Sequence, residues 1–493
     1  MKNTKKLLAV LLAVVMIVSI AISATVAYFK DTDKETNVIT IGDVTIDLHE
    51  DNGLDAADPD YALDEDYLTW LEGQILLPNT GVEKDVYVEN VGSNEAYIRV
   101  HVAIPADADN GDIASLVWND ETPSTFTVIG PYTAVVNGVN CNVYVATYND
   151  AIPSGETTAD CLTEVAMDEF VDCTRNDDNS ITYDLNGATY TSPDGKIPVE
   201  VFVEAGQVAG VNATNASEAL NIMFGTIGSY NPWVKTYTVA DATELADAVA
   251  KAYPGDTVAL SGTWTGTLEI GFAAEGIIID ASDAALTDID ITANAELTNV
   301  TFTGITDLSA PGTGYADAAI AINAGAKVTN LMITDSKFIA DDAKYPNVLW
   351  TAEPTATIYF TNCEFNGTRA FWTSTHSPAV LSFVKCDFLN IDYWVIQHNA
   401  TPCNTDITVD QCVFDNCTDG IMKLNSNNNG YISAGHKWTF TNNVLTNCAG
   451  HDGSDAKWFA VNTVENGATG VFSNNTLDGV AWTPGTDNGL NIG

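Results

Sequence analysis

Apolar and polar residues alternate along much of the first half of the chain, up to about residue 233. The alternation is clearest at 44–48, 86–88 and 97–104, where Val, Ile or Leu occupies every second position. Short clusters of Asn, Gly and Ser separate these runs. A period of two indicates strands that bury one face, and such spacing predicts an antiparallel β-sandwich or jelly roll. A short helix is expected at 217–224.

The second half repeats one short pattern seven times. Each copy runs from one apolar residue to another five positions later, through polar and small residues. Measured from Phe302, the copies are separated by 36, 27, 23, 26, 31 and 32 residues. Solenoid periods begin at about 20 residues, so we expect a parallel β-helix whose surplus residues form loops. The copies occupy 297–302, 333–338, 360–365, 383–388, 409–414, 440–445 and 472–477.

Two further columns follow from the same alignment. Cys363, Cys386 and Cys412 occupy one position in three copies, which predicts a stack of buried free thiols. Asparagines recur just after the copies, where side-chain amides can form a ladder along a turn. These asparagines are Asn366, Asn390, Asn416 and Asn447.

The N-terminus has the three parts of a secretory signal peptide. A basic start (MKNTKK) precedes an apolar stretch at 7–22 and small residues that end at Ala27, the expected cleavage site. The alternative is an uncleaved membrane anchor, because the apolar stretch approaches the length of a membrane span. We therefore expect export, with membrane contact only through this segment before cleavage.

Charge narrows the choice of partners. The chain carries 66 acidic and 19 basic side chains, a net charge of −47. Such a surface repels nucleic acid and anionic lipid, which excludes both as expected partners. Nine cysteines in an exported chain leave at least one thiol free or paired between molecules.

Several N-terminal segments resemble the TasA/camelysin family of exported proteins. They are AYFKDTD at 27–33, NVITIG at 37–42, LPNTG at 77–81 and VEAGQ at 203–207. The resemblance implies a jelly-roll domain and, as in several members, extracellular biofilm fibres in which a freed N-terminal strand completes the sheet of the next subunit. The donor strand would then include Tyr28, Phe29, Val38, Ile39 and Ile41.

The start of the second half resembles right-handed parallel β-helices of the pectin-lyase type. Asp241 and Glu244 form a capping box, and Leu245, Ala248 and Val249 follow as an apolar stripe. The sequence PGDTV then ends this predicted helix and starts a strand. The resemblance implies that the helix caps the first coil and covers its open edge.

Three local motifs support other chemistry only weakly. LPNTG is internal, so a turn between strands is expected rather than a sortase signal. His49-Glu50 is followed by Gly53 where a zinc protease needs a second His on a helix. The acidic loops at 51–55, 58–60 and 107–112 lack EF-hand spacing, so solvated turns are expected and Ca²⁺ stays an open alternative. No other cofactor is expected.

The second half also suggests a carbohydrate-binding surface. Trp or Ile recurs with His or Asn four residues later, and residues i, i+2 and i+4 of a strand share a face. We expect this column to face solvent, where sugar rings stack on aromatic faces. The alternative is that these tryptophans fill the core under loops. The predicted binding residues are Trp372, His376, Trp394, His398, Lys423, Asn425, Trp458 and Asn462.

The sequence thus predicts an all-β chain: a signal peptide (1–27), a jelly-roll domain (28–233) and a right-handed parallel β-helix (236–493). The hypothesis is an exported structural or adhesive protein of a bacterial cell surface or biofilm matrix, which binds polysaccharide and associates with itself. The alternative is a secreted polysaccharide lyase or glycoside hydrolase. It needs a base beside clustered carboxylates, and the sequence aligns no such cluster, so it does not support an enzyme.

Overall fold

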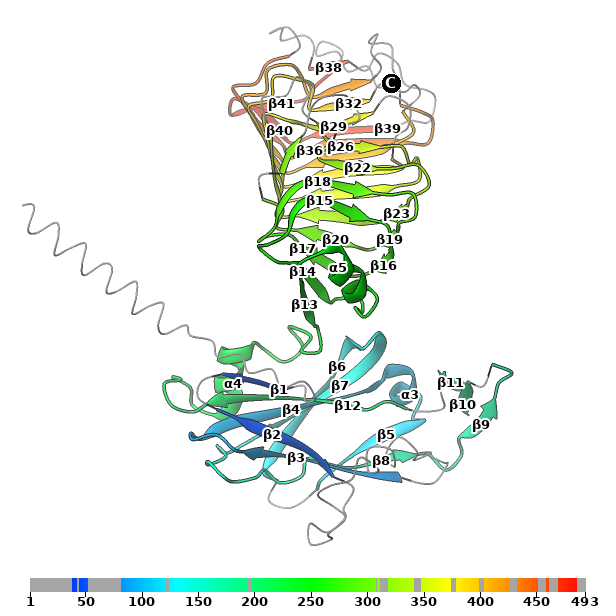
Figure 1. The fold of residues 1–493 in the computed structure, drawn as a ribbon, viewed down its shortest axis with the longest axis vertical. Helices are drawn as coiled ribbons and strands as arrows, with labels where there is room; N and C mark the ends of the chain where they lie inside the picture. The colour runs from blue at the N-terminus through cyan, green and yellow to red at the C-terminus, as the bar shows by residue number, and fades with distance from the viewer. Residues whose placement is uncertain are drawn as a thin grey trace, which may run out of the picture. The chain divides into compact units, whose positions relative to one another are not determined.

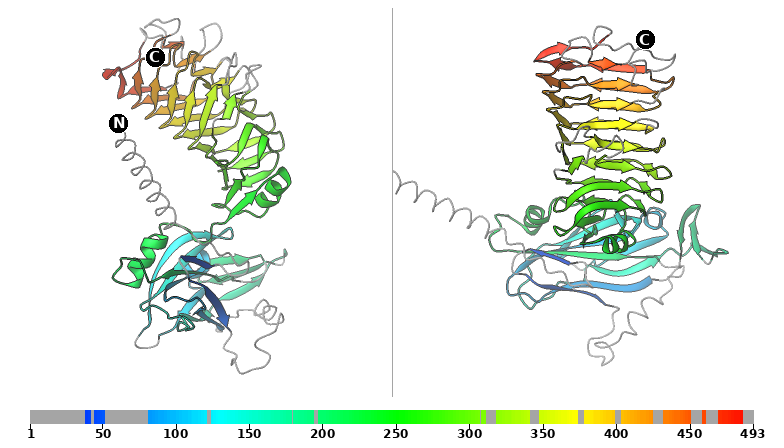
Figure 2. Two further views of the ribbon diagram at one scale, coloured as in Figure 1. Left: turned by 60° about the vertical axis from the view of Figure 1, so that its left-hand side comes forward. Right: turned by 45° about the horizontal axis from the view of Figure 1, so that its top comes forward.

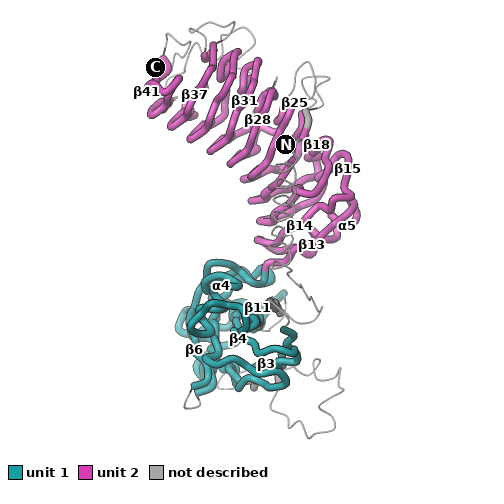
Figure 3. The backbone as a smooth tube through the Cα atoms, turned by 90° about the vertical axis from the view of Figure 1, so that its left-hand side faces the viewer, with its two compact units in different colours: residues 1–233 teal, residues 234–493 magenta. Residues whose placement is uncertain are grey.

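The chain forms two compact units that divide after Trp233, residues 1–233 and 234–493 (Figure 3). Both consist mainly of strands, which confirms the all-β class. Among the residues described below, no helix is long and apolar enough to cross a membrane. The computed structural model describes residues 38–41, 44–51, 81–120, 124–178, 180–193, 197–306, 308–310, 318–340, 347–373, 378–398, 403–424, 432–450, 458–460 and 469–485.

Unit 1 contains two sheets packed face to face (Figure 1). In spatial order, the first sheet contains β1 (Val38–Ile41), β12 (Glu200–Gln207), β4 (Ala96–Pro105), β7 (Val139–Tyr148) and β6 (Phe126–Val136). The second contains β2 (Ile46–Asp51), β3 (Gly81–Asn90), β8 (Leu162–Met167) and β5 (Ala114–Trp118). All neighbouring strands are antiparallel except β1, which is parallel to β12.

The alternation seen in the sequence produces the core of this sandwich. Val86 and Val88 of β3 are fully buried against Ile98, Val100 and Val102 of β4. The helix expected at 217–224 is α4 (Ala216–Phe224), which begins where the Asn215 side chain accepts a hydrogen bond from the Glu218 amide. The alternating apolar residues of the two sheets therefore share one core.

The long segment between β4 and β12 adds smaller elements. A one-and-a-half-turn helix, α3 (Ala106–Asn110), directly follows β4. A separate antiparallel sheet contains β11 (Ala188–Ser192), β10 (Ile181–Leu185) and β9 (Asp172–Arg175). All four side chains of its edge strand β9 are exposed.

A fully buried ion pair joins β4 and β12 to α4 and to the segment after it. Arg99 of β4 donates to Glu204 of β12, and both side chains are almost wholly excluded from solvent. Arg99 also donates to Asn221 Oδ1 at 3.0 Å and to the Gly225 carbonyl at 3.1 Å, and Tyr230 donates to Glu204. Removing one partner of such a pair costs about 3–5 kcal/mol, because the other charge stays buried.

His101 completes this network. Its Nε2 lies 3.2 Å from Glu204 Oε2, and its Nδ1 lies 3.2 Å from the Tyr132 hydroxyl. Burial lowers the pKa of His101, although the hydrogen bond and charge of Glu204 oppose this; the Arg99 charge lowers it further. Burial alone would raise the pKa of Glu204, but hydrogen bonds and charges from His101, Arg99 and Tyr230 outweigh it, so that pKa is also lowered.

Unit 2 is built from parallel strands that recur in a fixed order, as in a β-solenoid (Figure 2). Face 1 contains β13 (Thr236–Val239), β14 (Thr257–Leu260), β17 (Ile278–Asp280), β20 (Thr301–Thr303), β24 (Leu331–Thr334), β27 (Thr357–Thr361), β30 (Val380–Val384), β33 (Asp406–Asp410), β36 (Lys437–Thr441) and β39 (Thr469–Ser473). Face 2 contains β21 (Leu308–Ala310), β25 (Lys337–Ala340), β28 (Glu364–Asn366), β31 (Asp387–Leu389), β34 (Val413–Asp415), β37 (Val444–Thr446), β40 (Asn475–Leu477) and the antiparallel β41 (Val480–Trp482).

Face 3 contains β15 (Thr265–Ile270), β18 (Ala285–Ile291), β22 (Ile320–Ile322), β26 (Asn347–Thr351), β29 (Arg369–Thr373), β32 (Ile396–His398), β35 (Met422–Leu424) and β38 (Phe459–Ala460). A fourth, short sheet contains β16 (Ala273–Glu275), β19 (Glu296–Thr298) and β23 (Lys327–Thr329). The helix expected from the capping box is α5 (Ala242–Val249), and the Asp241 carboxylate accepts bonds from the Thr243 and Glu244 amides. Glu244 reaches back to the Ala240 amide.

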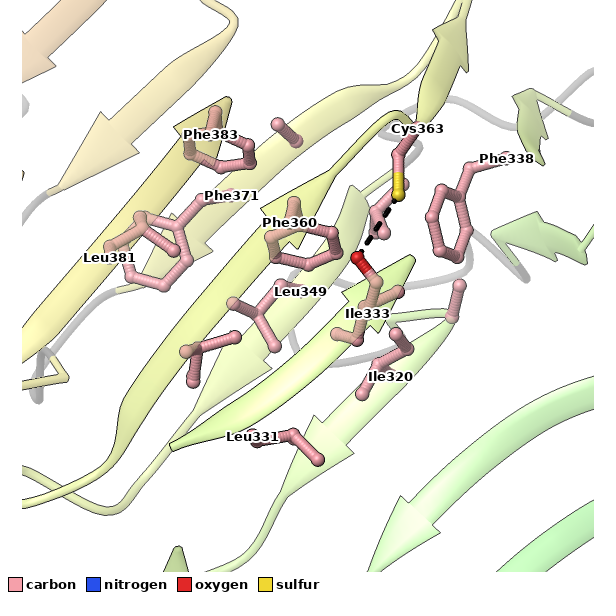
Figure 4. Packing of buried hydrophobic residues seen from close by; sticks show 14 of the residues in the cluster. Ile320, Leu331, Ile333, Phe338, Leu349, Phe360, Cys363, Phe371, Leu381 and Phe383 are labelled. Carbon is pink, nitrogen blue, oxygen red and sulfur yellow. Dashed lines mark hydrogen bonds between the residues drawn. The ribbon is translucent and has the colours of Figure 1, made fainter. Parts of the chain in front are cut away.

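The repeated apolar residues stack between coils as predicted (Figure 4). Phe338, Phe365, Phe388 and Phe414 are level across face 2, and their consecutive ring centroids lie 5.3, 5.0 and 4.6 Å apart. On face 1, the Phe360 and Phe383 rings stack with centroids 5.1 Å apart. Six of the seven aligned copies therefore share one register.

The alignment of the first copy is wrong. Phe302 lies level with Ile333 on face 1, whereas Leu308 lies level with Phe338 on face 2. Asn299, in the left-handed region at φ 54°, turns the corner before face 1, while Asn362 and its equivalents turn the corner after it. The same pattern of an apolar residue, a left-handed Asn and another apolar residue thus serves two corners, which the sequence alone does not distinguish.

Both predicted columns are present. The cysteines lie at the corner between faces 1 and 2, and the asparagines lie at the corner that follows face 2. Cys363, Cys386 and Cys412 are buried free thiols. Outside, Asn390 donates to Asn366 Oδ1 and Asn416 to Asn390 Oδ1, each at 3.0 Å. Asn447 does not extend this ladder to Asn416; its amide instead lies 3.4 Å from Asp415 Oδ1.

Unit 1 should lose stability on acidification through its buried network. Because the pKa of His101 lies below its ordinary 6.5, the folded state binds fewer protons than the unfolded state, and the free energy of unfolding falls as pH drops below about 6.5. Glu204 adds a second loss at lower pH for the same reason. Urea titrations of the full chain, followed by methyl NMR signals of Val100 and Val102, should show this slope.

His101→Gln should flatten that slope between pH 7 and pH 5, because glutamine does not titrate. His436→Gln in unit 2 is the control and should leave it in place. An unchanged slope in His101→Gln would contradict the assignment.

Candidate functional site

Face 3 of the solenoid presents one outward-facing line of side chains, which we call the outer column. Strand register places Ala321 level with Trp350, Trp372 level with Gln397, and Gln397 level with Lys423. Leu349 lies level with Phe371, so Trp350 is beside Trp372. The outer column consists of Glu269, Asp290, Ala321, Trp350, Trp372, Gln397 and Lys423.

The burial pattern shows which way this column faces. In β26, Leu349 and Thr351 are buried while Trp350 is partly exposed. In β35, Met422 and Leu424 are buried while Lys423 is partly exposed. Along the column, carboxylates in the first coils are followed by Ala321, two tryptophan rings, an amide and an ammonium group. Of the two rings, Trp372 is covered and only 5% exposed.

Two cations lie over aromatic rings beside this column. Lys423 Nζ is 6.0 Å from the centroid of the Trp394 ring, and Arg369 Cζ is 4.9 Å from the centroid of the Tyr393 ring. Both distances are within the range of cation–π attraction. The ring faces that these cations cover are not open to another ligand.

Lys423 has a perturbed pKa. Burial lowers it, the Asp419 carboxylate opposes that shift, and the Arg369 charge lowers it further. The positions of Lys423, Arg369 and Asp419 in the sequence do not place them in one column of the repeat.

The expectation that the predicted tryptophans face solvent is wrong. Trp372, Trp394 and Trp458 are only 5, 3 and 2% exposed. Nor do they share a column: Trp372 is level with Gln397, whereas Trp458 accepts the Ile421 amide through its carbonyl. The equal spacing of these residues in the sequence does not put them in one column, because loops of different length separate the strands. The register is determined by the inward-facing residues.

His398 also differs from its prediction. It is fully buried and lies level with Thr373 and Leu424. Lys423 is the one predicted residue among those described that keeps a partly exposed place on face 3. His376, Asn425 and Asn462 lie outside the described residues.

Sequence reasoning did not place four residues that the structure brings to this face. Trp350 could have been found only as a residue of the short strand NVLWT, on the face opposite to Leu349. Arg369, Tyr393 and Gln397 carry no such signal, since their places depend on strand register and on a contact across coils.

The N-terminal predictions are only partly within the described chain. Ala27, Tyr28 and Phe29 lie outside it, while Val38, Ile39 and Ile41 belong to β1. Val38 lies level with Val203 and Ile41 with Gly206, so this strand occupies the edge of its own sheet. Whether the segment also pairs with a second copy stays a prediction.

The candidate metal and protease motifs gain no support. His49 lies in β2 and stacks on Tyr87 with ring centroids 4.7 Å apart. In the 107–112 segment, the Asp109 carboxylate accepts bonds from Asn142 and Tyr144 at 2.7 and 2.8 Å. The other two acidic loops lie mostly beyond the described residues, within which no group of three or more His, Cys, Asp or Glu side chains could hold a metal ion.

No known protein family matches the chain, and no match is found among curated proteins or among solved structures.

The burial of the tryptophans predicts a difference in stability between two variants. Trp458→Ala should destabilise unit 2 by about 3–5 kcal/mol, because it removes a buried ring that packs on Trp482 at 5.3 Å. Trp350→Ala should cost clearly less, because part of its ring is already in water. Urea unfolding of the full chain should resolve the two; equal costs would contradict this assignment of burial.

Proposed function

We propose that the chain is an exported structural and adhesive protein of a bacterial cell surface or biofilm matrix. Its first unit is proposed to be a TasA-like jelly roll that positions or polymerises the protein. Its second is proposed to be a right-handed β-helix of the pectin-lyase type that presents a surface to polysaccharide. The signal-like N-terminus, the net charge of −47 and the two-sheet and parallel-sheet architectures support this proposal.

The outer column is the observation that carries the polysaccharide part. Neighbouring coils lie about 4.8 Å apart, so the side chains of the column lie along one line. Trp372 is only 5% exposed, so the accessible contacts are Trp350 on one side of it and Gln397 and Lys423 on the other. A partly exposed Trp350 ring, the Gln397 amide and the Lys423 ammonium group supply a stacking face and hydrogen-bond donors. A linear chain of sugars has hydroxyl groups and apolar ring faces at regular intervals, which fits such a line.

This revises the set of binding residues. Trp394 and Trp458 are buried, and Lys423 lies over the Trp394 ring. We therefore assign sugar stacking to Trp350, and hydrogen bonding to Gln397 and Lys423.

The binding proposal is tested by retention of the full chain on insoluble cell-wall and plant polysaccharides. An aromatic contact contributes about 0.5–1.5 kcal/mol, so Trp350→Ala should weaken binding about twofold to tenfold. The double variant Trp350→Ala/Gln397→Ala should bind the polysaccharide more weakly than Trp350→Ala alone. Tyr359→Ala, a partly exposed aromatic residue on face 1, is the matched control. Loss in the control as large as in Trp350→Ala would contradict the assignment.

Polymerisation is proposed to use the edge that β1 occupies. β1 has four residues and is the one parallel strand in its sheet, so few hydrogen bonds hold it. The same segment of a second copy would make the same backbone bonds to β12, so strand exchange costs little beyond chain ordering.

Electron microscopy of two versions of the chain tests this assembly. A chain that begins at Tyr28 should form fibres, whereas a chain that begins at Gly42 should stay monomeric because it lacks the exchanged strand. Equal behaviour of the two would contradict strand exchange.

One observation favours the enzymatic alternative. A polysaccharide lyase needs a base, and Lys423, whose pKa burial lowers, is partly exposed on face 3. If the protein is a lyase, unsaturated sugar products should form, and Lys423→Ala should abolish them while the exposed Lys437→Ala should not. Activity that survives in Lys423→Ala would contradict this role.

A further inference from the structure

Two cysteines, Cys417 and Cys448, occupy equivalent places in successive coils of the solenoid. Each directly follows an asparagine in the left-handed region, Asn416 at φ 56° and Asn447 at φ 52°. Each thiol donates to a carbonyl of the preceding coil: Cys417 to Phe388 at 3.3 Å and Cys448 to Phe414 at 3.5 Å. The two residues thus repeat one local structure, one coil apart.

Backbone hydrogen bonds hold these two places side by side. The Asn416 amide donates to the Thr446 carbonyl at 3.0 Å, and the Ala449 amide donates to the Cys417 carbonyl at 2.9 Å. Neighbouring strands lie about 4.8 Å apart, which falls inside the Cα separation of about 4.4–6.8 Å that a disulfide needs.

Access distinguishes this pair from the other stacked cysteines. Cys363, Cys386 and Cys412 are at most 2% exposed, and Cys417 is fully buried, but Cys448 is partly exposed. An oxidant can therefore reach Cys448 first, with Cys417 directly behind it as the second thiol. In the preceding coil, Ile391 is level with Cys417, because the Thr418 amide donates to the Ile391 carbonyl. Isoleucine has no thiol, so only one cysteine pair can form here.

We propose that Cys417 and Cys448 are a site of oxidative modification at which peroxide forms a disulfide between two consecutive coils. The protonation states suit this order. The neighbouring Cys417 thiol, more than burial, determines the pKa of Cys448, which is lowered, while the pKa of Cys417 is raised. The thiolate is the form that attacks an oxidant.

The reaction balances with hydrogen peroxide as the oxidant. The Cys448 thiolate attacks one peroxide oxygen, an S–O bond forms, the O–O bond breaks, and the released hydroxide is protonated to water. The Cys417 sulfur then attacks the sulfenic sulfur of Cys448; the S–S bond forms, the S–O bond breaks, and the leaving hydroxide takes the Cys417 proton. Two thiols and one peroxide give a disulfide and two waters.

The disulfide would fasten the coils that contain β34 and β37 to one another. It closes a loop of about 30 residues, whose cross-link restricts the unfolded chain more than the folded one. Amide hydrogen exchange in these two strands should therefore slow about tenfold or more after oxidation.

The test treats the full chain with hydrogen peroxide, blocks the remaining thiols by alkylation and maps the peptides by mass spectrometry. It uses a Cys173→Ser background, because Cys173 is exposed and would form disulfides between molecules. We expect a Cys417–Cys448 disulfide, with Cys363, Cys386 and Cys412 still reduced.

Two variants separate this pair from general oxidation. Cys448→Ser should abolish the cross-link and leave Cys417 reduced. The variant should fold, because a serine is already accommodated at the corner between faces 1 and 2, where the Ser336 hydroxyl hydrogen-bonds the backbone. Cys386→Ser, a stacked cysteine at that other corner, should leave the cross-link intact. Two results would overturn the proposal: Cys448 sulfinic acid that accumulates without a cross-link, or disulfides distributed among the other cysteines. Peptide mapping of the parent protein distinguishes these results even if a variant fails to fold.

Discussion

Side chains that turn inward at one corner of the solenoid hold its coils in register. At the corner between faces 1 and 2, a residue with φ near +55° is followed by an inward Ser, Cys or Asn. Each inward side chain bonds backbone of the preceding coil: Asn443 Oδ1 accepts the Cys412 amide at 2.9 Å, and its Nδ2 donates to the Val409 carbonyl at 3.1 Å. Cys363 does the same more weakly, through its thiol and the Ile333 carbonyl (Figure 4). Because an unsatisfied buried backbone group costs about 1–3 kcal/mol, this corner favours one register over any slipped one.

That register decides what the outside of the solenoid presents. Once the inward residues are level, the outward residues between them are level too, and Trp350, Gln397 and Lys423 fall on one line. The loops between strands vary in length without changing this line. The line of outward side chains is therefore a consequence of the core, and it does not depend on the geometry of the loops.

The sequence predicted the features that depend on local pattern, and it failed where geometry depends on coils far apart in the chain. The stacked phenylalanines, the buried thiols and both capped helices follow from periodicity and from short motifs. The first repeat was misplaced because one local pattern serves two corners, and the tryptophans were assigned to one solvent-facing column because spacing in sequence does not give register. The Arg99–Glu204 pair carried no local signal, since its partners lie 105 residues apart and meet only across paired strands.

The corner hydrogen bonds are tested most directly by amide exchange in the full chain, measured residue by residue by NMR. The amides of Cys412 and Asn443, which donate to side chains of the next coil, should exchange as slowly as the central amides of β33 and β36. Asn443→Ala should accelerate exchange in the coils on both sides, while Val444→Ala, whose side chain is 43% exposed, should not. Corner amides that exchange at the rate of an open turn, in the parent protein, would contradict the account.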